Sequence, residues 1–242
     1  EDCKFINPED MKSDNLLTNF ALNTTAHLEV QDNGKVNFIG SPTEGAILVV
    51  HDKVKKDSYN DVRKDAIVIH TYPFSSEEKK MTTIIEKEGK ILALTKGSTE
   101  KVLSLCKSVV TCDGIKNLSE EIKNIEEQVH YFESQAMRLI GFAHKELVEK
   151  YDYENDKKVI ETDMIFDGFV VIKDPIRKEV YGAINSCRDA GVSIKMLTGD
   201  NLITAKAIAS ELGIIDKNSL VLKASDVENM SDKELEEKID NI

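Results

Sequence analysis

Apolar and polar residues follow one another along the first part of the chain in runs that predict strands. The segments "DAIVIHTYPF" at 65–74 and "MTTIIEKEGKILALTKG" at 81–97 are rich in β-branched and apolar residues, as strands are. Glu88-Gly89 interrupts the second segment with a turn signal, which predicts two strands joined by a tight turn. Antiparallel pairing then places Phe74 and Lys96 at the ends of neighbouring strands.

Helical spacing flanks this predicted sheet. The segment "STEKVLSLC" at 98–106 offers a Ser or Thr cap and then apolar residues on adjoining turns, which predicts a helix packed on the sheet. From Ser119 to Leu139 apolar residues recur at alternating spacings of three and four. That spacing predicts a long amphipathic helix with Arg138 near its end. We therefore expect residues 1–165 to form an α+β domain with an antiparallel sheet and flanking helices.

The pattern changes after the charged stretch at 147–162. "GFVVIKDP" at 168–175 predicts a buried strand, a helix stopped by Gly191 follows, and "VSIKML" at 192–197 predicts a second strand before another helix. This order predicts a partial α/β segment over 166–242, with Asp174 and Asp200 meeting at the carboxyl edge of a parallel sheet. A polar turn at such an edge can hold a phosphate or a metal.

Composition limits the kinds of partner. The 242 residues carry a formal charge of −12, which disfavours a general nucleic-acid surface but leaves room for one bound nucleotide. No run approaches the roughly eighteen apolar residues of a membrane span, and the first residues lack the features of a signal peptide, so we expect a soluble chain that is not inserted in a membrane. The cysteines lack zinc-type spacing and predict reduced cytosolic thiols; they are Cys3, Cys106, Cys112 and Cys187.

Five residues could together form an adenine nucleotide site, although each has an ordinary structural explanation on its own. Phe74 offers a ring for stacking on a purine. Lys79 and Lys96 could bring ammonium groups to a polyphosphate, and Arg138 could add a fork of donors. Glu44, in "SPTEGA", could accept from an exocyclic amine. The chain contains neither a Walker P-loop nor a G-x-G-x-x-G motif.

Six motifs in one order give the chain a resemblance to the cytosolic part of the P-type cation-transporting ATPases. They are "SPTEGA" at 41–46, "FSSEEKKM" at 74–81, "KGSTE" at 96–100, "QAMRLIGFA" at 135–143, "DPIR" at 174–177 and "MLTGDN" at 196–201. The resemblance implies that the first four lie in a nucleotide-binding domain. It implies that the last two lie in a phosphorylation domain with a haloacid-dehalogenase-like Rossmann core.

Residue roles carry over with this resemblance. It implies that Phe74 stacks on adenine and that Glu44 lies near the purine. It implies that Lys79 and Lys96 line the nucleotide pocket, and that Arg138 approaches the phosphates.

The second region receives its roles from the same resemblance. Thr198 and Gly199 would hold the transferred phosphoryl group, and Asp200 would contact ATP or the surroundings of its Mg²⁺. Asp174 and Arg177 would brace the junction between the two domains.

Parts of the family's catalytic machinery are not in this sequence. The nucleophilic Asp of the family's D-K-T-G-T motif and its magnesium-binding G-D-G-x-N-D motif do not occur, and neither do the actuator domain and the membrane helices. The resemblance thus implies a cytosolic piece of a pump that binds ATP without turnover, because phosphoryl transfer needs both nucleophile and metal. Ser76 and Glu78 stand where related pumps often carry Arg, which is expected to weaken the contact with phosphates.

The transported ion and the class of protein leave alternatives open. "AGVSIKMLTGDNLITAKAIASELGI" at 190–214 is most similar to calcium pumps, especially those of the plasma membrane, although a pump for another ion is an alternative. The chain has no D-x-[DN]-x-[DN]-G loop, so direct tight calcium binding is not expected. A phosphatase of the same superfamily would need a nucleophilic D-x-D-x-T segment, which is missing. A non-enzymatic interaction module is the other alternative.

Overall fold

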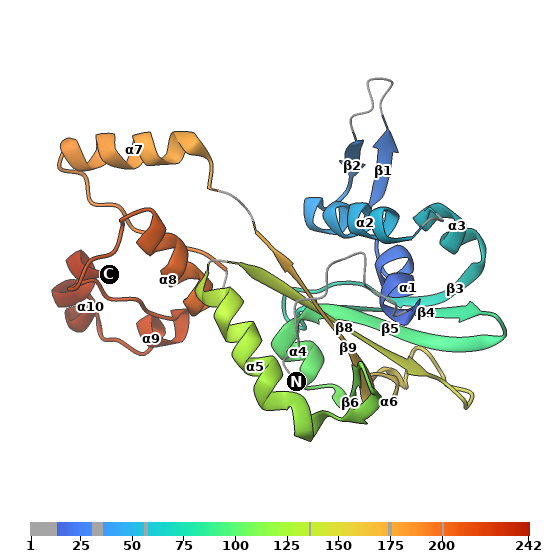
Figure 1. The fold of residues 1–242 in the computed structure, drawn as a ribbon. Helices are drawn as coiled ribbons and strands as arrows, with labels where there is room; N and C mark the ends of the chain where they lie inside the picture. The colour runs from blue at the N-terminus through green and yellow to red at the C-terminus, as the bar shows by residue number, and fades with distance from the viewer. Residues whose placement is uncertain (1–13, 31–35, 56–57, 136, 174–175, 200) are drawn as a thin grey trace. The chain divides into compact units, whose positions relative to one another are not determined.

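The computed structural model describes residues 14–30, 36–55, 58–135, 137–173, 176–199 and 201–242. Backbone contacts divide the chain into two compact units (Figure 1). The first comprises Glu1–Asn124 and Ile140–Val170, and the second comprises Ile125–Leu139 and Val171–Ile242.

A seven-stranded sheet organises the first unit. Its spatial order is β3-β4-β5-β8-β9-β6-β7, in which the pairs from β3 to β8 are antiparallel and β6 pairs with β9 in parallel. The sheet is therefore mixed, and the predicted antiparallel pairing holds for its first four strands. The strands are β3 (Ala66–Tyr72), β4 (Lys80–Lys87), β5 (Lys90–Ser98), β6 (Cys106–Thr111), β7 (Gly114–Asn117), β8 (Arg138–Glu146) and β9 (Met164–Ile172).

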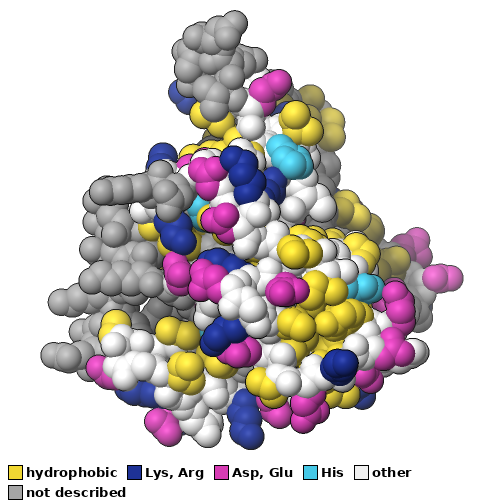
Figure 2. Space-filling view, turned by 90° about the vertical axis from the view of Figure 1, so that its right-hand side faces the viewer, with side chains coloured by type: hydrophobic (Ala, Val, Ile, Leu, Met, Phe, Trp, Pro, Cys, Tyr) yellow, Lys and Arg dark blue, Asp and Glu magenta, His cyan; other side chains and the backbone are white. Residues whose placement is uncertain are grey.

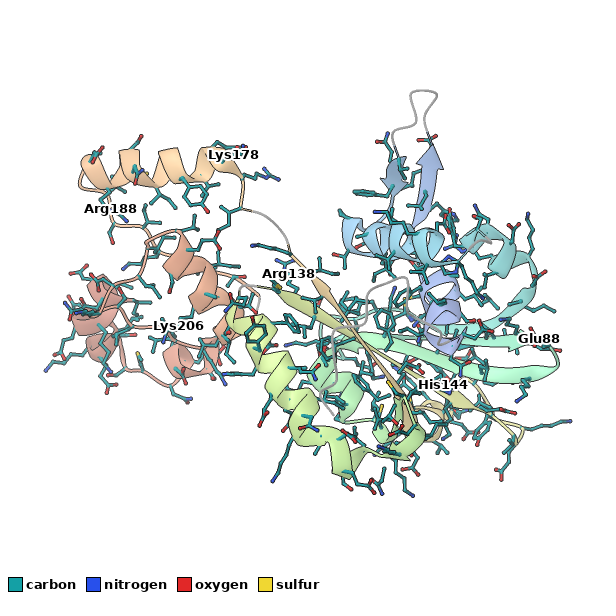
Figure 3. All side chains as sticks on the ribbon, viewed as in Figure 1. Glu88, Arg138, His144, Lys178, Arg188 and Lys206 are labelled. Atoms are coloured by element: carbon teal, nitrogen blue, oxygen red, sulfur yellow. The ribbon has the colours of Figure 1, made fainter. Side chains whose placement is uncertain are left out.

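The β4–β5 hairpin turns where the sequence predicted it. Glu88 and Gly89 both have positive φ, 52° and 76°, as a two-residue type I′ turn requires. Figure 3 labels Glu88 at the tip of this hairpin.

Helices cover both faces of the sheet. On one face lie α1 (Asp14–Leu22), α2 (Pro42–Val54) and α3 (Tyr59–Lys64), and a small hairpin of β1 (His27–Val30) and β2 (Val36–Ile39) precedes α2 (Figure 1). On this face Phe20 packs edge-to-face on Phe142 of β8, with ring centroids 4.8 Å apart. On the other face, α4 (Thr99–Leu103) approaches β8 so closely that a Cβ at Gly141 would lie 3.0 Å from the Cα of Thr99.

The long amphipathic helix is shorter than predicted. Helix α5 spans Leu118–Ser134, and Arg138 is the first residue of strand β8 rather than part of the helix (Figure 3). From Ile140, opposite Ser98, to Glu146 the chain pairs residue by residue with β5. The apolar spacing around Leu139 fits a helix or a strand, and the ladder that begins at the next residue accompanies the strand.

The strand predicted at 168–175 belongs to a different sheet from the one expected. Strand β9 begins earlier, at Met164, and lies between β8 and β6 in the sheet of the first unit. Met164 and Phe166 are buried there, and Val170 packs on the cluster that contains Phe20 and Phe142. A continuous apolar run indicates burial on both faces, but it cannot say which sheet provides the neighbours.

Apart from the end residues of β8 and β9 (138–139 and 171–172), the described residues of the second unit form helices and irregular segments. The helices are the residues of α5 from Ile125, then α7 (Lys178–Asp189), α8 (Leu202–Glu211), α9 (Ala224–Glu228), α10 (Asp232–Lys238) and a short 3₁₀ turn at Ile239–Asn241. The predicted strand at 192–197 does not form, and Leu197 is 92% exposed. A strand needs a hydrogen-bonded neighbour, and no strand of the described residues pairs with 192–197. Its predicted helices do form: α7 ends before Gly191, which has φ of 72°.

A glycine allows the end of the β3–β4 connection to lie close against β5. Gly97 lies opposite Lys80 in the β4–β5 register. A Cβ built on Gly97 would lie 2.8 Å from both the Cα and the Cβ of Lys80, and closer still to the carbonyl oxygen of Lys79. Real Cβ atoms do not approach backbone so closely, so this position in "KGSTE" requires glycine for space.

We expect Gly97→Ala to lower the free energy of unfolding by about 1–3 kcal/mol, because the backbone must move to admit one methyl group. Gly182→Ala is a matched control, since a Cβ there meets nothing within 4 Å and alanine favours the helix α7 by up to about 1 kcal/mol. Urea unfolding followed on the amide signals of each unit measures both variants. Equal stability of the parent and the Gly97→Ala chain would contradict the packing argument.

Candidate functional site

The pleat of β5 decides which face each of its side chains occupies. Lys96 lies opposite Met81 of β4 and Phe142 of β8, and directly opposed residues share a face. Because Phe142 contacts Phe20 of α1, Lys96 also points to the face that α1 and α2 cover. Thr95 and Gly97 point to the other face.

Lys96 is paired there with Glu44. Ser41 and Pro42 start α2 and place Glu44 in its first turn, where the helix dipole favours a carboxylate. Oε1 of Glu44 accepts from Nζ of Lys96, and Oε2 accepts from the amide and the hydroxyl of Thr25, each at 3.1 Å. The two side chains are 15% and 9% exposed, so the pair is largely withdrawn from water.

Two buried asparagines, which the sequence reasoning missed, hold α1 on the sheet beside this pair. The Nδ2 group of Asn19 donates to the carbonyls of Thr95 and Ala143, each at 3.1 Å. Asn23 donates to Asn19 and to the carbonyls of Met81 and Leu94. A signal was present, because two asparagines four residues apart in the apolar segment "LLTNFALN" lie on the same helix face as its core residues.

A small, shallow hollow that is open to solvent lies over the Lys96–Glu44 pair, and it encloses no space for even a water-sized group. Ligand pockets usually measure about 300–1,000 Å³, so the hollow as it stands is a surface depression and not a nucleotide-sized pocket. It combines apolar walls with amide, hydroxyl, carboxylate and ammonium groups. Its lining residues are Asn19, Phe20, Asn23, Thr24, Glu44, Ile47, Lys96 and Phe142.

Phe74 and Lys79 lie on the loop between β3 and β4, which we call the Phe74 loop (residues 73–79). The ring of Phe74 is 60% exposed, and an apolar ring left in water is available for stacking. Lys79 has φ of 52°, and its amide donates to the carbonyl of Ser75 at 2.8 Å. Its carbonyl accepts from the amide of Ser98 at 3.0 Å, so the loop is joined by backbone to the segment that carries Lys96.

Lys80 differs from its exposed neighbour Lys79. Its side chain is 4% exposed on the face opposite Lys96, where Nζ donates to Glu161 and lies 3.3 Å from Oε2 of Glu78. The other oxygen of Glu161 accepts from the hydroxyl of Thr82 at 2.6 Å. Alternation along β4 buries Lys80 because Thr82 and Ile84 face the same way.

Glu78 carries a charge that is already compensated. Its carboxylate pairs with Lys157 as well as with Lys80, and the hydrogen bond from Lys157 lowers the pKa of Glu78 below its ordinary value. The carboxylate of Glu78 therefore faces two cations of its own chain.

Burial and the charge of the partner shift the pKa values of Lys96 and Glu44 in opposite directions. Burial by itself raises the pKa of Glu44, but the charge of Lys96 and the hydrogen bonds at the carboxylate outweigh it and lower that pKa below 4.5. Burial lowers the pKa of Lys96, and Glu44 offsets part of that effect. Each partner thus favours the charged form of the other.

The remaining predicted site residues fall in the second unit or outside the described residues. Arg138 begins β8, Arg177 precedes the first turn of α7, and Thr198 and Gly199 lie in the exposed turn before α8. Asn201 caps α8, its Oδ1 accepting from the amide of Thr204 at 2.9 Å and its Nδ2 donating to Glu133 at 2.6 Å. Asp174 and Asp200 lie outside the described residues.

In the part of the chain that the structure describes, no group of three or more His, Cys, Asp or Glu side chains is placed to hold a metal ion. Among the same residues no helix is both long and apolar enough to cross a bilayer. The described cysteines are free thiols: Cys106, Cys112 and Cys187.

The sequence matches a family of known proteins. The family profile described as "P-type ATPase, cytoplasmic domain N" matches residues 12–179. The chain is 37% identical over 222 residues to "Calcium-transporting ATPase PAT1" of Dictyostelium discoideum, covering 91% of this chain and 20% of that protein. It is 34% identical over 223 residues to "Calcium-transporting ATPase 4, plasma membrane-type" of Arabidopsis thaliana, covering 91% of this chain and 21% of that protein. The chain thus spans about a fifth of the length of these relatives.

The lowered pKa of Glu44 predicts a pH-dependent contribution to stability. A carboxyl whose pKa is lower in the folded chain stabilises the fold above its unfolded value of 4.5, and this contribution is lost as pH falls through the lower folded value. We expect Glu44→Gln to cost about 1–3 kcal/mol at pH 7, because Lys96 loses its charged acceptor. The cost should shrink between about pH 5 and pH 3.

Urea unfolding of the parent and the variant across this range measures the difference. Glu86→Gln serves as a control, since Glu86 is an exposed carboxylate on β4 whose replacement should change stability by less than about 0.5 kcal/mol. A Glu44→Gln cost that stays constant down to pH 3 would refute the assignment to this ion pair.

Proposed function

The chain belongs to the family of P-type ATPase cytoplasmic N domains, and from this premise we propose that it binds ATP for a cation pump. The observation that carries the proposal is the joining of an exposed aromatic ring, Phe74, to the Lys96–Glu44 pair by the backbone bond between Lys79 and Ser98. A purine needs a flat apolar surface and a polar edge, and a triphosphate needs cations. The first unit contains residues of each kind.

The Lys96–Glu44 pair suits the edge of an adenine ring. Adenine presents an exocyclic amine beside ring nitrogens that accept hydrogen bonds. Glu44 can only accept and Lys96 can only donate, so the pair offers one group for each. Both are mostly buried, which strengthens a hydrogen bond to a ligand that excludes the remaining water.

Phe74 and Lys79 would complete the site outside the small hollow. Stacking on the exposed ring of Phe74 would hold the purine, while the exposed ammonium group of Lys79 would attract the phosphates. In this proposal Arg138 contributes to the phosphates as well. Magnesium accompanies the nucleotide and neutralises its phosphate charge when bound.

We assign residues 166–242, by proposal, to part of a phosphorylation domain with a haloacid-dehalogenase-like core. Thr198, Gly199 and Asp200 would then support the transferred phosphoryl group. Asp174 and Arg177 would brace the junction of domains 1–165 and 166–242. Support comes from the motif order and from Asn201, whose capping of α8 leaves the preceding turn at a helix N-terminus, where anions are favoured.

The proposed parent protein is a calcium-transporting ATPase of the plasma membrane, with this chain on the cytosolic face. Two observations support it: the names of the two relatives, both calcium-transporting ATPases, and their identities of 34–37% over most of this chain. The partners implied are the remaining pump domains, namely the actuator, the membrane helices and the rest of the phosphorylation domain. The ion itself would be bound by those parts.

Replacing the platform ring tests nucleotide binding. We expect Phe74→Ala to weaken ATP binding by about 1–3 kcal/mol, the range for loss of one base-stacking ring, which is roughly 5- to 150-fold. Tyr131→Ala is a matched control, because Tyr131 on α5 is an aromatic residue of the same 60% exposure. Calorimetric titration of the chain with ATP measures all three proteins. Equal affinity of the parent and Phe74→Ala would remove the stacking assignment.

The sequence predicts binding without turnover. The D-K-T-G-T motif that carries the family's nucleophile does not occur in the 242 residues, so no phosphoenzyme should form when the chain is incubated with γ-labelled ATP and Mg²⁺. Acid-quenched protein should retain no label. Stoichiometric, acid-stable label would show that another residue of this chain accepts the phosphoryl group.

A further inference from the structure

The Phe74 loop is fixed at both of its ends by one segment, which we call the anchor segment (residues 152–161). At the start of the loop, the hydroxyl of Tyr72 donates to the carbonyl of Tyr153 at 2.6 Å, and Nζ of Lys157 lies 5.2 Å from the centre of the Tyr72 ring. At its far end, Glu78 pairs with Lys157 and Lys80 pairs with Glu161. Lys157 therefore contacts residues on both sides of the loop.

Glu78 is the residue of the loop through which this anchoring acts. Its amide donates to Oγ of Ser75 at 3.0 Å, which closes the turn inside the loop. The side chain of Glu78 is 40% exposed and that of Lys157 is 32% exposed, whereas the side chain of Lys80 is buried. A bond between one loop side chain and one anchor side chain restricts the positions that Phe74 and Lys79 can take.

The backbone of Lys79 makes such restriction necessary. A lysine in the left-handed region, with φ of 52°, is in a sparsely populated conformation that persists only where the surroundings impose it. The amide and carbonyl of Lys79 are held by Ser75 and Ser98. Glu78, the residue just before Lys79, is held by its ion pairs with Lys80 and Lys157.

We propose that Glu78 is a positioning residue for nucleotide binding, which holds the Phe74 loop in its binding conformation through Lys157 of the anchor segment. The inference rests on the proposed function, because it assumes that Phe74 receives a purine. It differs from what the sequence suggests, since an acidic residue beside a polyphosphate would be expected only to repel it. In this chain the carboxylate of Glu78 instead forms ion pairs with Lys80 and Lys157.

Two ligands separate positioning from repulsion. Adenosine has no phosphate, so its affinity reports the placement of the ring of Phe74, whereas ATP affinity also responds to the charge of the loop. Glu78→Gln and Lys157→Gln should each weaken adenosine binding about fivefold. Glu78→Gln should weaken ATP binding less than adenosine binding, because it also removes a negative charge near the phosphates.

Glu77→Gln is the matched control. Glu77 is the exposed neighbour of Glu78, and its replacement removes the same charge one residue away; it should leave adenosine affinity unchanged. In the double variant Glu78→Gln/Lys157→Gln the loss of adenosine binding free energy should be less than the sum of the two single losses, because both substitutions break the same Glu78–Lys157 contact. Calorimetric titration of the 242-residue chain gives the affinities, and urea unfolding verifies that each variant is folded.

The outcomes are distinct. If Glu78→Gln binds adenosine as well as the parent does, or if the Glu78 and Lys157 effects add, the positioning role is refuted while the nucleotide site stands. If the parent chain binds neither ATP nor adenosine at millimolar concentration, the proposed function and the positioning role both fall. Weakened adenosine binding in both single variants, with an unaffected Glu77→Gln, supports the positioning role.

Discussion

The close approach of the backbone at 79–80 to Gly97 is the constraint on which the arrangement of the first unit depends. Strand β5 carries Lys96 and, one residue later, offers no Cβ, so the chain at Lys79 and Lys80 can lie directly against it. That contact brings the Phe74 loop to the strand that bears Lys96. It also sends adjacent lysines to different surroundings: Lys79 is exposed, and Lys80 is buried against Glu161.

Short-range signals in the sequence predicted local elements well. The turn at Glu88-Gly89 formed because both residues can adopt positive φ, and the placement of Glu44 in a first turn followed from Ser41 and Pro42. Long-range pairing was not available from these signals. The apolar spacing around Leu139 was compatible with a helix or a strand, and the pairing with β5 that begins at Ile140 accompanies the strand. The apolar run of β9 was compatible with either of two sheets, and its strand neighbours place it in the sheet of the first unit.

For the candidate site, too, the sequence predicted some residues and missed others. Residue types that suit a nucleotide could be picked from the sequence, and the structure joins Glu44 to Lys96. The partners that hold them in place could not be picked, because Asn19, Glu161 and Lys157 come from segments distant in the chain. Whether a lysine points into a sheet or into water depends on the strand's register, which composition does not contain.

The close contact at Gly97 couples sequence changes at position 97 to sequence changes at 79–80. A side chain can enter at position 97 only if the backbone at 79–80 retreats, and such a retreat would carry the aromatic ring and its neighbouring cation away from the strand. Neither stretch is free to drift alone. In a set of descendants of this protein, the two should therefore vary jointly or stay fixed, even where the surfaces around them diverge.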